Sequence, residues 1–241
     1  MKDICKACGR LLHEENAIGN KNGYNLLRCN FCETVTVSPF PSEQQLIEFY
    51  QNYKGTAGYN KKRDKKIKRS IKRVRKIINF TRGKRFLDVG CNAGYVVYAA
   101  QLLGFDAFGI ELDCETVSEA QKEFGEELFK CTTIQEYAKT NRQFDVIYTS
   151  EVIEHVPDPD AFLKSASGLL DKGGVLYLTT PDGNHFTLPK NFSSWNAVTP
   201  PEHIIYFTKK GLNILLAKHG FKIEKTFFNI KPGIKLIARK V

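Results

Sequence analysis

Residues 85–95, RFLDVGCNAGY, run from an apolar segment directly into small residues. The apolar residues at 86–89 predict a buried strand, and Gly90 and Gly94 predict a tight turn after it. Glycines at such a turn let the backbone approach a ligand closely, and a helix that begins at Gly94 presents free N–H groups to an anion. The stretch therefore predicts a ligand-binding loop between a strand and a helix.

Beyond this stretch the chain alternates apolar segments with helical ones. Strands are predicted at 85–89, 106–110, 127–131, 144–149 and 174–180, with helices between them at about 94–103, 114–124, 133–138 and 159–170. Alternation of this kind predicts β-α-β units and a parallel sheet. A helix from Thr208 to His219 follows, and then two strands joined by the turn 231–233, which makes them antiparallel neighbours. The expected fold class is α/β: a doubly wound, mostly parallel sheet of seven strands with a C-terminal antiparallel hairpin.

The first 38 residues are expected to be a separate module defined by cysteines. Two Cys-x2-Cys pairs flank a polar stretch that has too little apolar surface to fold unaided. A tetrahedral Zn2+ held by four thiolates would stabilise it, so we expect a structural zinc ribbon; the alternative is four reduced cysteines without metal. The expected zinc ligands are Cys5, Cys8, Cys29 and Cys32. The remaining cysteines, Cys91, Cys114 and Cys131, are expected to be small buried residues.

Residues 39–84 are expected to connect this module to the main domain, residues 85–241. Ser42 with Gln45 is a capping-box pattern that starts a helix reaching about Tyr53. A second helix over 61–79 has its apolar residues on one face and basic residues on the others. Residues 61–85 carry 14 Lys and Arg residues and one acid, so the net charge of +10 belongs to this segment.

This basic segment has two readings. It is either the solvated face of a docked helix, or a surface that attracts a phosphorylated substrate or RNA. No aromatic residue interleaves the charges of the helix over 61–79, so base stacking on this helix is poorly supported.

A second signal for ligand binding is Glu111, at the end of the strand in FGIELD. A carboxylate there accepts hydrogen bonds from both hydroxyls of a ribose; the alternative is a charge at a helix N-terminus, a role that suits Asp113 better. Dinucleotide-binding folds share both signals, but Gly90-x-Asn92-x-Gly94 lacks two glycines of G-x-G-x-x-G. A ligand that ends in an amino-acid carboxylate, such as S-adenosylmethionine, suits this loop. Asn92 is expected with φ near or below zero, or in the left-handed region that Asn tolerates.

These segments together resemble the class I S-adenosylmethionine-dependent methyltransferases. LDVGCNAGY (87–95) resembles the first motif of that family, and FDVIYTSEVIEHVPDPDAFL (144–163) resembles the stretch after its fourth strand. PPEHIIYFTKKGLNILLAKHGF (200–221) resembles the C-terminal segment of members related to ubiquinone-biosynthesis and natural-product sugar methyltransferases. The N-terminal cysteines resemble a zinc-ribbon extension that some of these members carry. The resemblance covers nearly the whole chain, and its motifs are specific for the cofactor.

The resemblance implies that S-adenosylmethionine binds at the carboxyl ends of the strands. The glycine loop would lie at its methionine end, which Ser150 and Glu151 would flank. Glu111 would hold the ribose, and Leu112 would pack on the adenine. The implied cofactor-binding residues are Asp88, Gly90, Asn92, Gly94, Glu111, Leu112, Thr133, Ile134, Ser150 and Glu151.

Methyl transfer from a sulfonium is an in-line displacement, which needs a base only when the acceptor loses a proton. His155 and His203 are the candidate catalytic bases, with Glu154 and Tyr206 as lesser candidates; all four can instead hydrogen bond within the loops that carry them. Residues 191–201, which include Trp195, mix polar and aromatic side chains as a substrate-pocket wall does, or form a lid that packs on the core.

The expected function is methyl transfer to a small-molecule biosynthetic intermediate, such as a nucleotide-linked sugar or a quinone-type precursor. One alternative is an RNA- or protein-modifying methyltransferase that docks through the zinc ribbon and the basic helix. Another is a non-catalytic zinc-binding module on this scaffold. The start of the chain has no apolar signal-peptide core, and no stretch approaches about 20 apolar residues, so we expect a cytoplasmic location without membrane binding.

Overall fold

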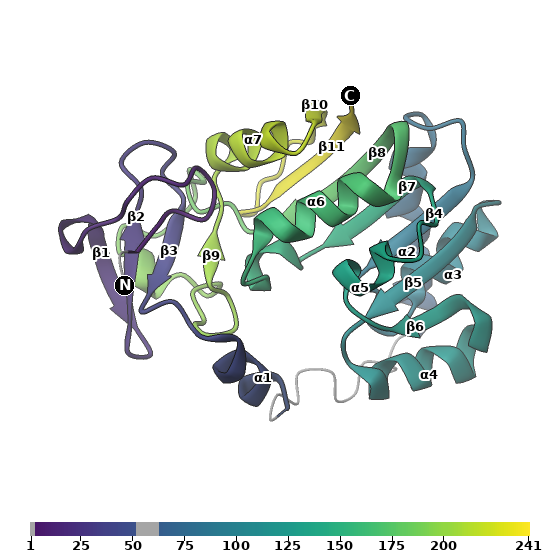
Figure 1. The fold of residues 1–241 in the computed structure, drawn as a ribbon, viewed down its shortest axis with the longest axis horizontal. Coiled ribbons are helices and arrows are strands. Elements are labelled where there is room, and N and C mark those ends of the chain that lie inside the picture. Colours follow the sequence, from purple (N-terminus) through teal and green to yellow (C-terminus); the bar gives the residue numbers. More distant parts are fainter. Residues whose placement is uncertain (1–2, 52–62) are drawn as a thin grey trace.

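Figure 1 shows the computed structural model, which describes residues 3–51 and 63–241. A seven-stranded sheet in the order β10-β11-β8-β7-β4-β5-β6 forms its centre. Five strands run parallel: β4 (Arg85–Val89), β5 (Asp106–Glu111), β6 (Phe129–Cys131), β7 (Phe144–Ser150) and β8 (Leu170–Thr180). β11 (Ile234–Lys240) runs antiparallel to both β8 and β10 (Phe221–Thr226). This sheet confirms the predicted fold class.

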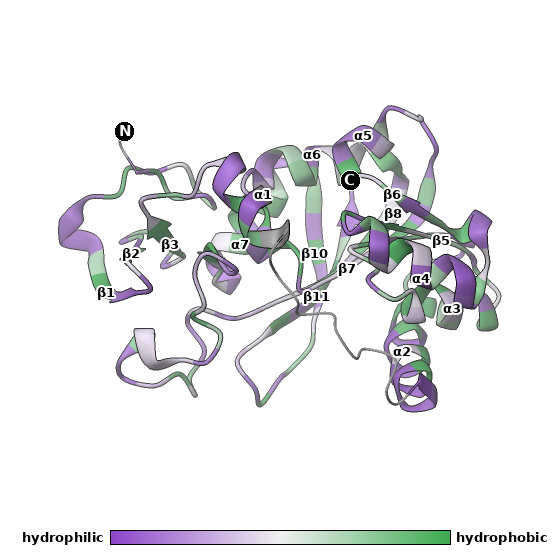
Figure 2. Cartoon of the chain, turned by 90° about the horizontal axis from the view of Figure 1, so that it is seen from below, coloured by the Kyte–Doolittle hydropathy of each residue, from purple (hydrophilic) through white to green (hydrophobic). Residues whose placement is uncertain are grey.

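Helices cover both faces of the sheet, each over its own buried apolar cluster. One face carries α2 (Arg63–Ile78), α3 (Tyr95–Leu102) and α4 (Cys114–Phe124), and the other carries α5 (Ile134–Ala138), α6 (Pro159–Leu169) and α7 (Lys209–Lys218). The apolar face of α2 packs as predicted, because Val74 and Ile77 are fully buried against the sheet. Figure 2 shows the mixture of hydrophilic and hydrophobic residues along this helix.

The predicted helix caps are present as side-chain hydrogen bonds. Before α1 (Glu43–Gln51), the Ser42 N–H donates to Gln45 Oε1 (2.9 Å) and the Gln45 N–H donates to Ser42 Oγ (3.2 Å). Thr208 accepts from the Gly211 N–H at the start of α7 (3.0 Å). The predicted helix ends at Tyr53 and at residue 61 lie outside the described residues. Four short 3-10 helices, η1 to η4, span Glu14–Asn16, Glu126–Leu128, Ile153–His155 and Phe192–Ser194.

The N-terminal cysteines belong to a second, four-stranded sheet. Its order is β1-β2-β3-β9, and all its neighbours are antiparallel: β1 (Ala17–Lys21), β2 (Tyr24–Arg28), β3 (Val35–Ser38) and β9 (Ile205–Tyr206). The sequence patterns predicted neither β1, which is polar, nor β9, which has only two residues. In Figure 1, β9 lies between β3 and the central sheet. The N-terminal module therefore shares a strand with the C-terminal third of the chain.

Two predictions from the sequence are corrected by the structure. Cys114 and Cys131 are not separate buried residues, because they form a disulfide with a Cα–Cα distance of 5.1 Å. The parallel pairing of β5 with β6 brings the two strand ends together, which sequence spacing does not reveal. Cys91 is buried as predicted. The terminal strands are joined by residues 227–233 and not by a three-residue turn, because β10 ends at Thr226.

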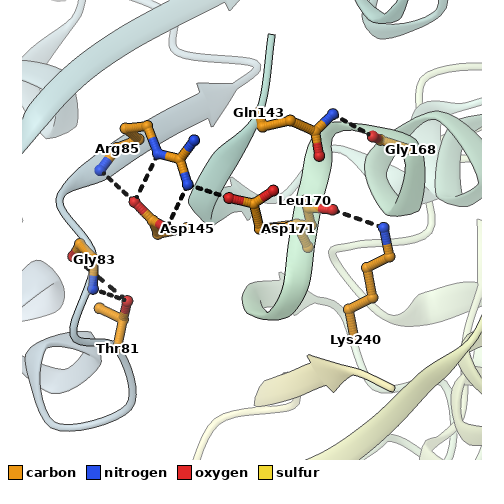
Figure 3. A network of polar contacts seen from close by, with 9 residues as sticks. All are labelled: Thr81, Gly83, Arg85, Gln143, Asp145, Gly168, Leu170, Asp171 and Lys240. Atoms are coloured by element: carbon orange, nitrogen blue, oxygen red, sulfur yellow. Dashed lines mark hydrogen bonds and ion pairs between the residues drawn. The ribbon is translucent and has the colours of Figure 1, made fainter. Parts of the chain in front are cut away.

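A polar network ties together the amino ends of β4, β7 and β8 (Figure 3). The Arg85 guanidinium donates two hydrogen bonds to Asp145 (2.7 and 3.0 Å) and also pairs with Asp171. Asp145 and Asp171 border a hollow of about 400 Å³. It lies at the opposite end of the strands from the predicted site, and ligands of open α/β sheets bind at the carboxyl ends. We therefore regard this network as structural.

Candidate functional site

The loop after β4 and the carboxylate at the end of β5 lie together. The Asn92 N–H donates to Glu111 Oε2 (3.0 Å), and Glu111 Oε1 accepts from the N–H groups of Leu112 (2.7 Å) and Asp113 (3.3 Å). β4 has β5 on one side and β7 on the other, so strand order reverses there. The two predicted binding signals thus meet at the place where such folds bind ligands.

The conformation of this loop requires its glycines. Gly90 and Gly94 both have φ of 75°. A Cβ atom on Gly90 would lie 2.5 Å from a methyl carbon of Val152, and one on Gly94 would lie 2.6 Å from the ring of Phe129. Asn92 has φ of 45°, so it adopts the second of the two conformations expected for it, the left-handed one.

Asp88 and the end of β6 surround Glu111. Asp88 is 2% exposed, and burial, together with the charge of Glu111, raises the pKa of its carboxyl well above the ordinary value. The Thr132 N–H donates to the Glu111 carbonyl (2.9 Å), which places Thr133 beside the predicted ribose position. Leu112 is 68% exposed on the rim, whereas Ile134 is buried within the core. Of these three implied cofactor-binding residues, Leu112 and Thr133 therefore remain open to a ligand, and Ile134 does not.

Ser150 and Glu151 lie at the carboxyl end of β7 and are linked through Thr179. The Thr179 hydroxyl donates to Glu151 Oε1 (2.7 Å), so it accepts from Ser150 Oγ (2.7 Å). Glu151 has φ of 58°, an uncommon conformation for a residue other than glycine. Backbone strain of this kind clusters at functional sites. Sequence reasoning missed Thr179; the parallel register of Ser150 with Thr179 is the signal that identifies it.

The two candidate bases lie side by side. The rings of His155, in η3, and His203 have centroids 4.6 Å apart. Nδ1 of His155 lies 2.7 Å from the Glu202 carbonyl oxygen, and Nδ1 of His203 lies 2.7 Å from that of Ala197. A carbonyl only accepts hydrogen bonds, so each ring carries its proton on Nδ1 and a lone pair on Nε2. Burial, followed by the charge of His203, lowers the pKa of His155 to about 4.

Glu154 lies beneath this pair, fully buried. Its Oε2 accepts from the Thr180 hydroxyl (2.9 Å). Burial, followed by the charge of Glu151, raises the pKa of the Glu154 carboxyl well above the ordinary value, which favours the neutral form. Ligand atoms of Glu154, His155 and His203 lie within 4.8 Å of one another, so the three side chains could also hold a divalent cation.

The four N-terminal cysteines converge on one point. Their sulfur atoms lie within 4.8 Å of one another, with 3.4 Å between Cys5 and Cys32 and 3.6 Å between Cys8 and Cys29. Tetrahedral zinc with bonds of about 2.3 Å needs sulfur atoms about 3.8 Å apart, so this geometry fits the metal. The chain turns back after each cysteine pair. The Gly9 N–H donates to the Cys5 carbonyl (2.8 Å), and the Glu33 N–H donates to the Cys29 carbonyl (2.8 Å).

Comparisons with known proteins add to this geometry. Residues 59–226 match the family model described as a methyltransferase domain. The chain is similar to ubiquinone biosynthesis O-methyltransferases from Parvibaculum lavamentivorans (37% identity over 101 residues, 40% of each chain) and from a Bradyrhizobium species (30% over 148 residues, 59% of this chain and 55% of that one). The matches thus span about half the length of these curated relatives.

Solved structures share the fold. A magnesium protoporphyrin IX methyltransferase from Synechocystis PCC 6803, solved with bound S-adenosylmethionine, has a TM-score of 0.51 at 18% identity and covers 73% of this chain and 79% of its own. A SAM-dependent methyltransferase from Archaeoglobus fulgidus has a TM-score of 0.57 at 17% identity and covers 72% and 94%. In the described part of the chain, no helix has the length and apolar character that a membrane crossing requires.

Proposed function

We propose a function from the premise that the chain belongs to the methyltransferase-domain family, whose model matches residues 59–226. The protein binds S-adenosylmethionine and transfers its methyl group to a hydroxyl of a small molecule. The hydrogen bond from the Asn92 N–H to Glu111 carries this proposal, because it holds the loop after β4 against the acid at the end of β5. The glycine loop would then lie at the methionine end of S-adenosylmethionine, and the Glu111 carboxylate would accept hydrogen bonds from the ribose.

The test is binding of S-adenosylhomocysteine by isothermal titration calorimetry. Glu111→Gln keeps the size of the side chain and removes the charge that would accept the ribose hydroxyls. We expect the dissociation constant to rise about tenfold or more, since hydrogen bonds to a charged group contribute about 1.5–3 kcal/mol. Glu115→Gln, on the exposed first turn of α4, is the matched control. Equal affinity in the wild type and both variants would place the pocket elsewhere.

The two histidines favour an acceptor that loses a proton. When bound, S-adenosylmethionine supplies a methyl group already activated by the sulfonium, so the residues of the chain have to align the acceptor and take its proton. Burial disfavours the charged form of His155. We therefore assign proton acceptance to Nε2 of His203, and we assign His155 the role of a neutral neighbour that orients the acceptor hydroxyl. A phenolic hydroxyl, as in a quinone-type precursor, fits this arrangement, and the relatives named ubiquinone biosynthesis O-methyltransferases support it.

One observation favours a second acceptor class, a nucleotide-linked sugar. Arg69, Arg73 and Lys76 follow one another at helical spacing on α2, and Lys235 on β11 lies opposite Thr179. Burial, followed by the charges of these three residues, lowers the pKa of Lys235. Within the described residues none of the four forms an ion pair, so together they offer an anion such as a diphosphate a cationic neighbourhood near Ser150 and Glu151.

Lys235→Met distinguishes the two acceptor classes. Uridine diphosphate serves as the probe, and Lys222→Met, on the exposed side of the neighbouring strand β10, is the control. Affinity for the diphosphate that falls about tenfold only in Lys235→Met supports the sugar class. If the wild type does not bind the diphosphate, the result excludes the nucleotide-linked sugar and favours the quinone-type precursor as the acceptor.

The four cysteines hold a structural Zn2+ in this proposal. Their sulfur geometry supports it, as does the burial of Cys5, Cys29 and Cys32 at 1%, 2% and 0% exposure, because buried thiolates need a cation. Purified protein should release one equivalent of zinc on treatment with a thiol-blocking mercurial. Absence of zinc in protein expressed with added Zn2+ would contradict this assignment.

A further inference from the structure

The cysteine module, residues 3–38, and the segment that carries His203 share hydrogen bonds along β3 and β9. We call residues 191–206 the wall segment. The Val37 N–H donates to the Ile204 carbonyl (3.2 Å), and the Ile204 N–H donates to the Glu154 carbonyl (3.0 Å). Ile204 directly follows His203, and Glu154 directly precedes His155. A single residue thus connects β3 to the backbone of both histidines.

The wall segment is packed as one unit around His203. The Tyr206 hydroxyl donates to the His203 carbonyl (3.1 Å), and the ring of Tyr206 lies 6.1 Å from that of Trp195. The His203 ring is held by the carbonyl of Ala197, which belongs to the same segment. A shift of β9 would therefore move the ring of His203 along with its backbone.

Two further contacts tie the cysteine module to this part of the chain. The Asn22 side-chain N–H2 donates to the Pro200 carbonyl (2.8 Å), three residues before His203. The carbonyl of Cys32 accepts from the hydroxyl of Thr208 (2.6 Å), which lies two residues beyond the wall segment. The buried residues of both regions, such as Leu26, Val35 and Tyr206, belong to one apolar cluster.

The cofactor loop has no such connection. Residues 90–94 and Glu111 are placed by β4 and β5, and between described residues no hydrogen bond joins the cysteine module to them. A change in the cysteine module should therefore reach the acceptor side of the site and spare the loop at 90–94 and Glu111.

We propose that the metal-bound cysteine module positions His203 for the acceptor through Val37 and Asn22, and that it has no part in binding the cofactor. The module is then a fixed wall of the active site and not a separate docking domain. This inference rests on the proposed function, because it assigns His203 to the acceptor side of a methyl-transfer site. Val37 and Asn22 are positioning residues, since they touch neither the acceptor nor the cofactor.

Removal of zinc tests the inference in the full chain. Trp195 is the only tryptophan of the protein, so its fluorescence reports on the wall segment alone. We expect chelation to shift the Trp195 emission, to increase its quenching by acrylamide, and to move the 15N resonances of the His203 imidazole. The dissociation constant of S-adenosylhomocysteine should change less than about twofold, and added Zn2+ should restore the fluorescence and the resonances.

A pair of variants tests the same link with the metal in place. Asn22 has φ of 51°, which glycine adopts readily, so Asn22→Gly removes only the contact with Pro200. Asn20→Ala is the matched control in the same hairpin, because the Asn20 amide bonds to Asn25 within the module (3.1 Å). We expect Asn22→Gly to move the His203 resonances and Asn20→Ala to leave them in place.

Two outcomes would overturn the inference: folded metal-free protein with unchanged Trp195 emission and His203 resonances, or identical spectra in both asparagine variants. If chelation unfolds the whole chain, the asparagine variants decide. Failure of the untreated protein to bind S-adenosylhomocysteine would instead overturn the proposed function, while the spectra still report on the link between the module and His203.

Discussion

At the scale of single residues, the site combines groups whose charge is suppressed with groups that accept backbone hydrogen bonds. Burial favours the neutral forms of Asp88, Glu154 and His155, whereas Glu111 accepts three N–H groups. A hydrogen bond to the charged form of a carboxylate stabilises it, and burial without a partner does the opposite. On the proposed acceptor side of the site, Glu154 and His155 therefore favour their neutral forms.

The neutral state of His155 predicts a pH dependence of stability. Its pKa is held at about 4, below the ordinary value of about 6.5, so between these values the unfolded chain binds a proton that the folded protein does not. Stability that is present above pH 6.5 is then lost as the pH falls. Urea unfolding should show the wild type losing about 2 kcal/mol more than His155→Gln between pH 6.5 and 4.5. Equal losses in the two proteins would contradict the burial of a neutral imidazole.

At the scale of elements, the contacts that shape the site form between strand ends and helix starts. The start of α7 packs directly on the cysteine module: a Cβ atom on Gly211 would lie 2.1 Å from the buried Thr34 hydroxyl oxygen. The Cys114–Cys131 disulfide joins the end of β6 covalently to the start of α4. Leu112 lies two residues before Cys114.

Gly211→Ala should separate α7 from the module. We expect a loss of about 2–3 kcal/mol in the free energy of unfolding, because overpacking a buried contact forces neighbouring groups apart. Gly168→Ala, in the neighbouring helix α6, is the matched control, since nothing lies within 4 Å of its added Cβ. That variant should be neutral or more stable by about 0.5–1 kcal/mol, as alanine is the better helix former. Similar unfolding free energies for Gly211→Ala and Gly168→Ala would show that the contact between α7 and the module does not contribute to stability.

Reduction of the disulfide should destabilise the fold where β6 ends and α4 begins. The bond joins residues 17 apart in sequence, and closing a loop of this length contributes about 3 kcal/mol in the chain-entropy account. Chemical denaturation with and without a phosphine reductant measures this contribution. The double variant Cys114→Ser with Cys131→Ser should have the stability of the reduced wild type and show no further effect of the reductant. An unfolding free energy of the wild type that does not change on reduction would contradict the stabilising role of the disulfide.

At the scale of the whole molecule, the two sheets share one apolar core. The cluster on the α6–α7 face of the central sheet includes Leu26 and Val35 of the cysteine module as well as Phe207 and Leu212. β9 completes the smaller sheet from a segment between β8 and α7. Neither part retains its full core without the other.

This shared core predicts one cooperative unfolding transition. Scanning calorimetry of the full chain should show a single peak, and chelation of zinc should lower its midpoint, because a metal that binds only the folded protein stabilises the whole unit. An independent module would instead give a separate, metal-sensitive transition. Such a transition would also weaken the proposed link between the metal and His203.

Local patterns were enough to predict the central domain. The five parallel strands and the helices between them follow from short-range periodicity and caps. Asp158, directly before α6, is an example, because its carboxylate accepts from the Ala161 N–H (2.9 Å) and Pro159 begins the helix. The loop at 90–94 and Glu111 could be placed for the same reason, because each directly follows a strand whose carboxyl end is known from the topology. Their roles in binding the cofactor remain predictions.

Contacts between distant segments could not be predicted in this way. The pairing of β3 with β9 joins residues about 170 positions apart, the Cys114–Cys131 bond depends on strand order, and Thr179 reaches Glu151 only through the register of β7 and β8. The sequence by itself determined the α/β elements, the glycine loop after β4 and the four-cysteine cluster, because a residue's neighbours along the chain set backbone preference and burial pattern. Only the tertiary structure decided that the cysteine module borders the two histidines, because that adjacency depends on which strand edges meet when the chain folds.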